Sequence, residues 1–256
     1  MTSLKASTTE RSELAGKVAV ITGASRNIGR AIALTVADAG AAVVVNARVS
    51  KTEAASVAKE IEGRGGRAAV HMADVSDERM VSGLVNSAIS RFGRLDIMIC
   101  NAAIRLDRPV LETSYEDFQA MLNATVGSSF LCAKAAIPHL IAVGGGAIVM
   151  IGGIGGHVGT IGRCASTSGK AAVAGLTRAL AAELGPKRIT VNCVAPGLID
   201  TVGRIGVPAH LKQPSPLGRR GTPDEVAAAV RLLCGPGGQF ITGQTIHVNG
   251  GLLMAG

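Results

Sequence analysis

The sequence contains few aromatic side chains: among 256 residues there is no Trp, one Tyr and four Phe. Proteins that bind single-stranded nucleic acid stack the bases on aromatic rings. The lysines and arginines behind the net charge of +8 are dispersed along the chain, without a basic run. We therefore expect no nucleic-acid partner and assign the positive charge to an anionic cofactor or substrate.

Long apolar runs and paired cysteines are also absent. No apolar run reaches the roughly 18 residues of a membrane span, so we expect no membrane insertion. Residues 1–16 are polar, lack the apolar core of a secretory signal, and are expected to form a flexible tail. The cysteines are odd in number, without CxxC spacing or a Cys–His cluster, which favours reduced thiols, a cytoplasmic location and no metal site. They are Cys100, Cys132, Cys164, Cys193 and Cys234.

From Lys17 onward, short apolar runs alternate with segments of helical spacing. Continuous apolar runs are typical of strands buried on both faces of a parallel sheet. We predict strands at 18–22, 41–46, 67–72, 95–100, 147–152 and 189–195, and helices at 30–40, 52–66, 78–93, 114–142 and 169–185. With right-handed crossovers, this predicts an α/β fold over residues 17–256. It is a single-domain, Rossmann-like, doubly wound parallel sheet of about seven strands with helices on both faces.

The first predicted strand leads into a glycine turn, TGASRNIGRAIA (22–33). A tight turn at Gly23 exposes backbone amides around Ser25–Ile28 and aims the start of the next helix at a phosphate. The turn follows the first strand of the domain, where such sheets bind dinucleotides. An ordinary strand-to-helix turn is the alternative.

This turn and the motifs that follow it resemble the short-chain dehydrogenase/reductase family. TGASRNIG is similar to the TGxxxGxG motif of that family. Matches follow in the family's order: DVSD (74–77), CNAA (100–103), Lys170, VAPGLIDT (194–201) and FITGQTIHVNGG (240–251). The resemblance covers residues 17–256 and is greatest to the single-domain branch that includes 3-oxoacyl-carrier-protein reductases. It implies an NAD(P)-dependent oxidoreductase that acts on a small molecule.

The resemblance also implies a set of coenzyme-binding positions. They are Gly23, Ser25, Arg26, Asn27, Ile28, Gly29, Asn46, Arg48, Asp74, Val75, Asn101, Ala102, Ala103, Lys170, Pro196, Gly197, Ile199 and Thr201. Asn27 and Ala103 stand where the family has glycine. Asparagine is the residue next most tolerant of a positive φ angle, and alanine is small, so we expect binding to persist.

The end of the second predicted strand, VVVNARVS (43–50), bears on the choice of coenzyme. An acidic residue there would accept from a ribose 2′-hydroxyl and select NAD. None is present, and Asn46, Arg48 and Arg26 offer donors and positive charge to a 2′-phosphate. We predict NADP(H), with NAD(H) as the alternative.

The catalytic positions depart further from the family. There, a tyrosine serves as acid or base, a serine holds the reacting oxygen, and an asparagine supports the lysine. The matching positions hold Ser166, Gly153 and Thr125, and only Lys170 agrees. The single tyrosine, Tyr115, is expected to be a surface residue at a helix start. General acid catalysis contributes ~10²–10⁴-fold, so we expect simple ketone reduction to be disfavoured.

Three outcomes remain open at this site. An activated carbonyl or imine needs only positioning and hydride delivery. Alternatively, another group donates the proton, and His157 titrates in the right range, although a loop histidine without a role is the competing interpretation. Lys170, Ser166 and His157 are thus the candidate catalytic residues. The third outcome is that the chain is a catalytically silent NADP(H)-binding homologue, or a non-redox lyase or isomerase.

The substrate and the assembly are expected from weaker signals. The segment 201–217 carries Arg204, His210 and Lys212, which suggests an anionic or carrier-linked substrate as a hypothesis, with a merely solvated lid as the competing interpretation. The resemblance implies a homotetramer, or a dimer. The apolar ending GLLMAG is compatible with burial against a neighbouring subunit.

Overall fold

The computed structural model describes residues 13–104, 106–202 and 215–254. Most of the expected N-terminal tail lies outside the described residues. So do Arg204, His210 and Lys212, on which the expectation of an anionic substrate depends.

Seven parallel strands form one sheet in the order β3-β2-β1-β4-β5-β6-β7. The strands are β1 (Val18–Ile21), β2 (Ala42–Ala47), β3 (Arg67–Met72), β4 (Ile97–Cys100), β5 (Gly146–Ile151), β6 (Ile189–Pro196) and β7 (Thr245–Val248). The α-helices are α1 (Asn27–Asp38), α2 (Lys51–Gly63), α3 (Glu78–Phe92), α4 (Tyr115–Leu122), α5 (Ser128–Ala142), α6 (Cys164–Leu184) and α7 (Pro223–Cys234). The predicted doubly wound α/β fold is confirmed.

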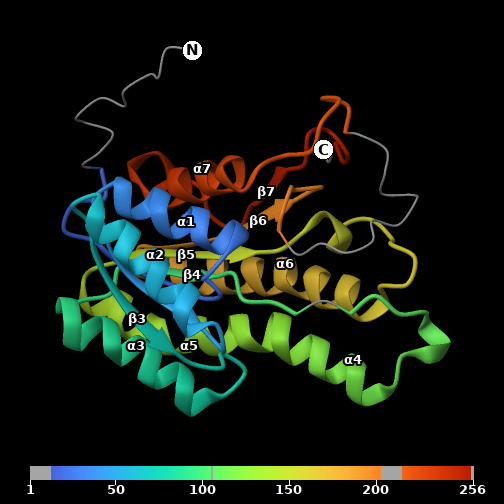
Figure 1. Cartoon of the computed structure of the whole chain (residues 1–256), viewed down its shortest axis with the longest axis horizontal. Helices are drawn as coiled ribbons and strands as arrows, with labels where there is room; N and C mark the ends of the chain where they lie inside the picture. The colour runs from blue at the N-terminus through green and yellow to red at the C-terminus, as the bar shows by residue number, and fades with distance from the viewer. Residues whose placement is uncertain (1–12, 105, 203–214, 255–256) are drawn as a thin grey trace.

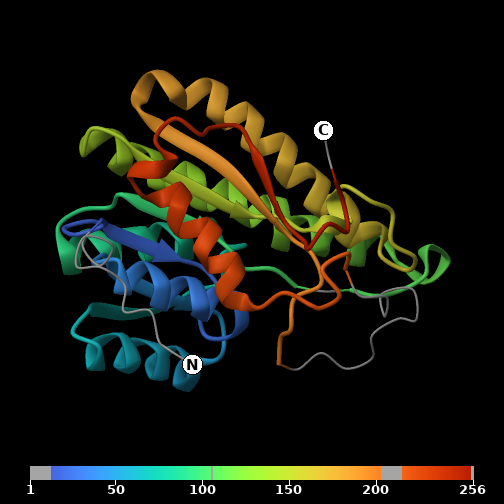
Figure 2. The ribbon, with the colours of Figure 1, turned by 90° about the horizontal axis from the view of Figure 1, so that it is seen from above.

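Helices cover both faces of the sheet, which explains why the central strands are apolar throughout. α1, α2 and α7 bury their apolar residues against one face, and α3, α5 and α6 against the other. Figure 1 shows α1 and α7 on one side of the strands and α3 and α5 on the other. From above, α1 and α7 lie side by side (Figure 2). Each side chain of a central strand therefore meets a helix.

Two helices begin earlier than predicted, and a third was not predicted. α1 begins at Asn27 and α6 at Cys164, so both start before their predicted first residues. Small and polar residues fill these first turns, and they carry no apolar period from which a helix start can be read. α7 was not predicted, although Thr222 and Glu225 form a capping box, which is a helix-start pattern.

The predicted helix 114–142 is one continuous helix with a π-helical turn, Asn123–Gly127, between α4 and α5. Residues Tyr115–Ala142 are long and apolar enough to cross a membrane, a property that core helices of soluble proteins share. Here α5 packs against α3 and β4, so part of its apolar surface is buried in the fold.

Candidate functional site

A cavity of about 720 Å³ lies at the carboxyl ends of β1, β2, β3 and β4. The chain runs from β1 outward to β2 and β3, then returns to place β4 on the other side of β1. Loops leave β1 and β4 in opposite directions at this point, which opens a crevice between them. The cavity thus occupies the position where open α/β sheets bind ligands.

Most of the predicted coenzyme-binding residues line this cavity. They are Gly23, Ser25, Arg26, Asn27, Ile28, Gly29, Asn46, Arg48, Asp74, Val75, Asn101, Ala102 and Ala103. Five others do not line it, namely Lys170, Pro196, Gly197, Ile199 and Thr201. They belong to α6 and to the exit of β6, which lie beyond the cavity on the β5–β6 side of the sheet.

Sequence reasoning missed another group of lining residues. They are Ala47, Val49, Ser50, Ala73, Ser76, Ile104, Ala120, Asn123, Ala124 and Ser128. The first six are chain neighbours of predicted residues, so extending each motif by one or two positions would have found them. Those from α4 to α5 carry no local motif, and the π-helical turn that presents Asn123 and Ala124 is a feature often found at functional sites.

Gly23 and Gly29 of the glycine turn leave no room for a side chain. A Cβ atom added to Gly29 would lie 2.2 Å from the Gly23 carbonyl oxygen and 2.6 Å from Asn101 Nδ2. Asn101 Nδ2 donates to the carbonyls of Thr22 (2.9 Å) and Gly23 (3.0 Å), which ties the turn to the end of β4. Gly23 itself has a positive φ of 60°. The turn is therefore a backbone cradle, as phosphate binding at a helix start requires.

Asn46, at the end of β2, is buried with its side-chain amide fully engaged. Its Oδ1 accepts from Gly23 N (3.2 Å), and its Nδ2 donates to the carbonyls of His71 (3.2 Å) and Ala73 (3.1 Å). Both amide hydrogens are thus used inside the protein. Asn46 holds the glycine turn against β3, and donors for a 2′-phosphate must come from elsewhere.

Arg48 is 60% exposed at the rim of the cavity, 3.5 Å from the Asp74 carboxylate. Hydrogen bonds from Ser76, and then the nearby Arg48, hold the pKa of Asp74 below its ordinary value. The exposed guanidinium is free to turn toward a ligand because this pairing is long and solvent-accessible. Together with Arg26, it makes this end of the cavity positive.

Lys170 projects from α6 toward the end of β5. Its Nζ donates to the Ile151 carbonyl (2.9 Å), and burial lowers the lysine pKa to about 8. The nearby Cys193 thiol has the opposite effect and raises the pKa of Lys170. Gly153 leaves the lysine stem uncovered, since an added Cβ would meet Lys170 Cγ and Cδ only at 3.9 Å. Space for an additional group therefore exists beside Lys170.

Ser166 lies one helical turn before Lys170, but its hydroxyl is used elsewhere. It donates to the Leu106 carbonyl (3.2 Å) and lies 3.7 Å from Met121 Sδ. Thr125, in the π-helical turn, is buried and packs under Gly169, where an added Cβ would approach Thr125 Cβ to 3.1 Å. In this arrangement, the Ser166 hydroxyl bonds to a loop carbonyl rather than to Lys170.

His157, in the loop after β5, packs edge-on against His247 of β7, with ring centroids 4.7 Å apart. Partial desolvation, His247 and Arg178 hold the pKa of His157 below its ordinary value, so the ring is neutral near pH 7. Sequence reasoning did not single out His247, which lies within the TIHVNGG stretch. Tyr115 is the first residue of α4 and is 69% exposed, which confirms that it is a surface residue.

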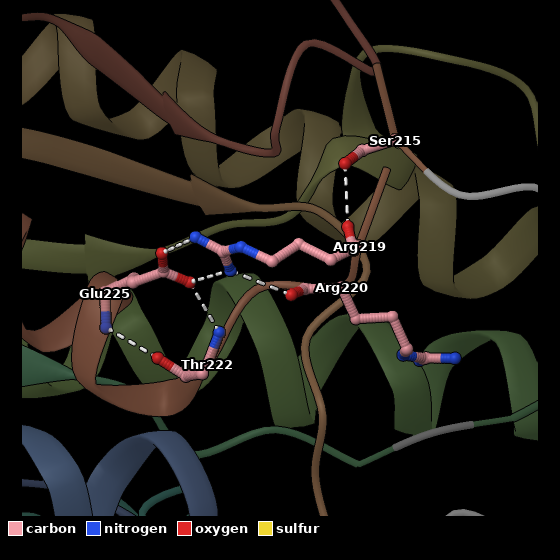
Figure 3. Close-up of polar contacts among 5 residues, drawn as sticks. All are labelled: Ser215, Arg219, Arg220, Thr222 and Glu225. Carbon is pink, nitrogen blue, oxygen red and sulfur yellow. Dashed lines mark hydrogen bonds and ion pairs between the residues drawn. The ribbon is translucent and has the colours of Figure 1, made fainter. Parts of the chain in front are cut away.

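The chain that leaves β6 is held by the segment before α7. Asp200 N donates to the Gly221 carbonyl (2.8 Å), and Arg220 Nε lies 2.7 Å from Asp200 Oδ1. Figure 3 shows what fixes this segment: the Ser215 hydroxyl donates to the Arg219 carbonyl, and Arg219 pairs with Glu225 in the first turn of α7. The residues after Pro196 are thus anchored next to α7.

The arrangement combines a phosphate cradle, a positive rim and a lysine near the end of β5. Residues 23–253 match the protein family described as Enoyl-(Acyl carrier protein) reductase. The 3-oxoacyl-[acyl-carrier-protein] reductase of Synechocystis sp. is 39% identical over 243 residues, which are 94% of this chain and 98% of the relative.

Two solved structures have the same fold over nearly their whole length. A short chain dehydrogenase from Burkholderia cenocepacia in complex with NADP is 36% identical with a TM-score of 0.88, covering 93% of this chain and 98% of its own. A 7 alpha-hydroxysteroid dehydrogenase complexed with NADH and 7-oxo glycochenodeoxycholic acid is 34% identical with a TM-score of 0.90, covering 96% and 97%.

Proposed function

Because the chain belongs to the short-chain dehydrogenase/reductase family, we propose that it is an NADP(H)-dependent oxidoreductase that reduces an activated carbonyl or imine. The main support is the cavity over a turn whose Gly23 and Gly29 admit no side chain, with Arg26 and Arg48 at its rim. Related structures hold NADP or NADH, so a nicotinamide coenzyme suits this cleft.

The preference for NADP(H) rests on charge. Arg48 offers a planar guanidinium able to form paired hydrogen bonds to a 2′-phosphate. Asn46 occupies the end of β2 without offering a carboxylate to a 2′-hydroxyl, and its amide hydrogens are already engaged. We therefore assign the recognition of the 2′-phosphate to Arg48 and Arg26.

When bound, the coenzyme supplies the hydride. The chain's own residues bind and orient it: the amides of the glycine turn hold the phosphates, and Pro196, Gly197, Ile199 and Thr201 flank the nicotinamide. Lys170 positions the ribose beside the substrate. Gly153 and Ser166 replace the family's serine and tyrosine, so no phenol is available to protonate the reacting oxygen. This absence favours a substrate that is already electron-poor.

A catalytically silent NADP(H)-binding homologue is the second candidate. Its support is specific: the Ser166 hydroxyl is bonded to the Leu106 carbonyl and the Lys170 amine to the Ile151 carbonyl. His157 as an alternative proton donor is disfavoured by its packing against His247 and by its lowered pKa. Both candidates share the coenzyme site and differ only in turnover.

One experiment tests the proposal and separates the two candidates. NADPH is titrated into the protein by fluorescence, and its oxidation is then followed with a panel of ketones, quinones and cyclic imines. We expect binding, turnover with a quinone or imine, and little turnover with simple ketones. Binding without turnover on every class would favour the silent homologue. Failure to bind either coenzyme would overturn the proposal.

The remaining properties follow from relatives. We propose a small-molecule substrate, and a carrier-linked one is consistent with relatives named for acyl-carrier-protein substrates. We also propose a homotetramer, or a dimer, located in the cytoplasm. The exposed Phe130 and Ile141 on α5 suit a subunit contact.

A further inference from the structure

Asn27, the first residue of α1, is bonded to a residue 175 positions later in the chain. Val202 N donates to Asn27 Oδ1 (2.9 Å), and Asn27 Nδ2 donates to the Val202 carbonyl (3.3 Å). Both bonds join the side-chain amide of Asn27 to the backbone of Val202, one through the amide oxygen and one through the amide nitrogen. They join the glycine turn directly to the chain that leaves β6.

The backbone of Asn27 makes this contact notable. Its φ of 51° is left-handed, a region that disfavours residues with a Cβ atom and suits glycine. Among the described residues, Arg188 is the other non-glycine with positive φ (58°), and it lies at the opposite, amino edge of the sheet. Glycine at position 27 would relieve the strain but would also remove both bonds to Val202.

The position of the contact indicates what it does. Asn27 lines the cavity at the phosphate end, and Val202 follows the Ile199–Thr201 segment assigned to the nicotinamide end. That segment is held on its other side by the Gly221 carbonyl and by Arg220. The Asn27–Val202 contact therefore links the wall assigned to the pyrophosphate with the wall assigned to the nicotinamide.

We propose that Asn27 is a coenzyme-retention residue: its side chain fastens Val202 beside the pyrophosphate, and the coenzyme leaves after these two bonds break. This inference rests on the proposed function, because it requires a nicotinamide coenzyme in this cleft. It concerns the rate of release and assigns Asn27 no part in the chemical step.

The test measures the dissociation rate of NADPH by stopped-flow fluorescence, with excess NADP⁺ added to displace the bound coenzyme. We expect Asn27→Gly and Asn27→Ala each to release NADPH about tenfold faster than the natural protein, which corresponds to about 1.4 kcal/mol. Arg188→Gly is the matched control, since it relieves a similar strain far from the cleft. We expect its release rate to be unchanged.

Amide hydrogen exchange provides a second measurement. In the NADPH complex, the Val202 amide should lose protection in Asn27→Gly and Asn27→Ala but not in Arg188→Gly. Faster release in Asn27→Gly alone would assign the effect to backbone flexibility and overturn the inference, as would unchanged release in both variants. If the natural protein does not bind NADPH at all, the proposed function fails first and the inference fails with it.

Discussion

At the scale of single residues, Lys170 is strongly altered by its surroundings. Burial lowers its pKa from 10.5 to about 8 while its amine bonds to the Ile151 carbonyl. A charged amine that is partly removed from water destabilises the folded chain unless a ligand compensates. The apoprotein therefore keeps Lys170 at a cost in stability, which is typical of functional groups.

This cost predicts a pH-dependent effect of Lys170→Met. Between pH 8 and 10.5, the unfolded chain still binds the lysine proton and the folded chain does not, so the stability of the natural protein rises with pH. We expect the variant to be more stable at pH 7 by up to about 3 kcal/mol, with the difference shrinking across this window. Urea unfolding at several pH values measures it. Lys134→Met, at an exposed lysine, should show no such trend, and a constant difference for Lys170→Met would contradict the argument.

The proposed absence of a phenol at position 166 predicts a gain of function. Gly153→Ser combined with Ser166→Tyr should increase NADPH-dependent ketone reduction by ~10²–10⁴-fold, the usual contribution of a positioned general acid. Position 153 accepts a side chain, because an added Cβ meets no atom closer than 3.9 Å. Initial rates with a simple ketone measure the change. Tyr115→Phe in the same background should not change the rate. A double variant that binds NADPH but reduces the ketone no faster would contradict the assignment of Gly153 and Ser166 to the family's serine and tyrosine positions.

The rim arginine predicts the coenzyme preference. Arg48→Ala should weaken NADPH binding about tenfold and leave NADH binding nearly unchanged, because only NADPH carries the 2′-phosphate that a charge-assisted bond recognises. Fluorescence titration with both coenzymes measures the ratio. Arg91→Ala, on an exposed position of α3, is the control. If the binding of NADPH and NADH weakened equally, Arg48 would instead contact a part of the coenzyme that both share.

At the scale of elements, apolar strands were predicted more reliably than helix starts. Strand β3 was predicted with its observed bounds, Arg67–Met72, because glycines precede it and the polar DVSD stretch follows it. α6 begins at Cys164, before its predicted start, because the stretch CASTS has no apolar period and is helical through packing against α4. The π-helical turn at Asn123–Gly127 also has no pattern in sequence.

The capping box of α7 predicts a measurable stabilisation. Thr222 Oγ1 accepts from Glu225 N (3.3 Å), and the Glu225 carboxylate accepts from Thr222 N (2.8 Å). Thr222→Ala should lower the free energy of unfolding by about 1 kcal/mol, because the backbone amide of Glu225 loses its partner, the Thr222 hydroxyl. Urea unfolding measures the loss. Ser82→Ala, on the exposed face of α3, should change the free energy of unfolding little. An equal loss in both variants would show that the capping box does not stabilise the protein.

At the scale of the whole molecule, the two edges of the sheet serve different purposes. The carboxyl edge holds the cavity described above, while the amino edge holds a second cavity, of about 560 Å³, with a buried carboxylate in its wall. Asp96 is 2% exposed and accepts from Arg94 (2.7 and 2.8 Å), Lys17 (3.1 Å) and Val18 N (3.0 Å). These contacts tie the starts of β1 and β4 together and hold the pKa of Asp96 below its ordinary value. This edge contributes stability rather than chemistry.

Asp96→Asn tests that division of roles. We expect a loss of about 2–3 kcal/mol in the free energy of unfolding, since both cations lose their counter-charge. NADPH affinity should remain unchanged. The natural protein should lose this contribution as the pH falls below the ordinary pKa of an aspartate, because its pKa is lowered in the folded state. Urea unfolding at pH 7 and pH 3 measures both effects, and a variant as stable as the natural protein would contradict the assignment.

The sequence by itself determined the parallel sheet, the glycine turn and most of the residues that line the cavity. These features depend on short-range patterns: an apolar run makes a strand, and a turn built on glycines can expose backbone amides wherever it lies. The tertiary structure alone decided which partners the polar groups take. Asn46 bonds to His71 and Ala73, Ser166 to Leu106, and Asn27 to Val202. Such partners lie 25 to 175 positions apart, and only the order of the strands in the sheet brings them within hydrogen-bonding distance.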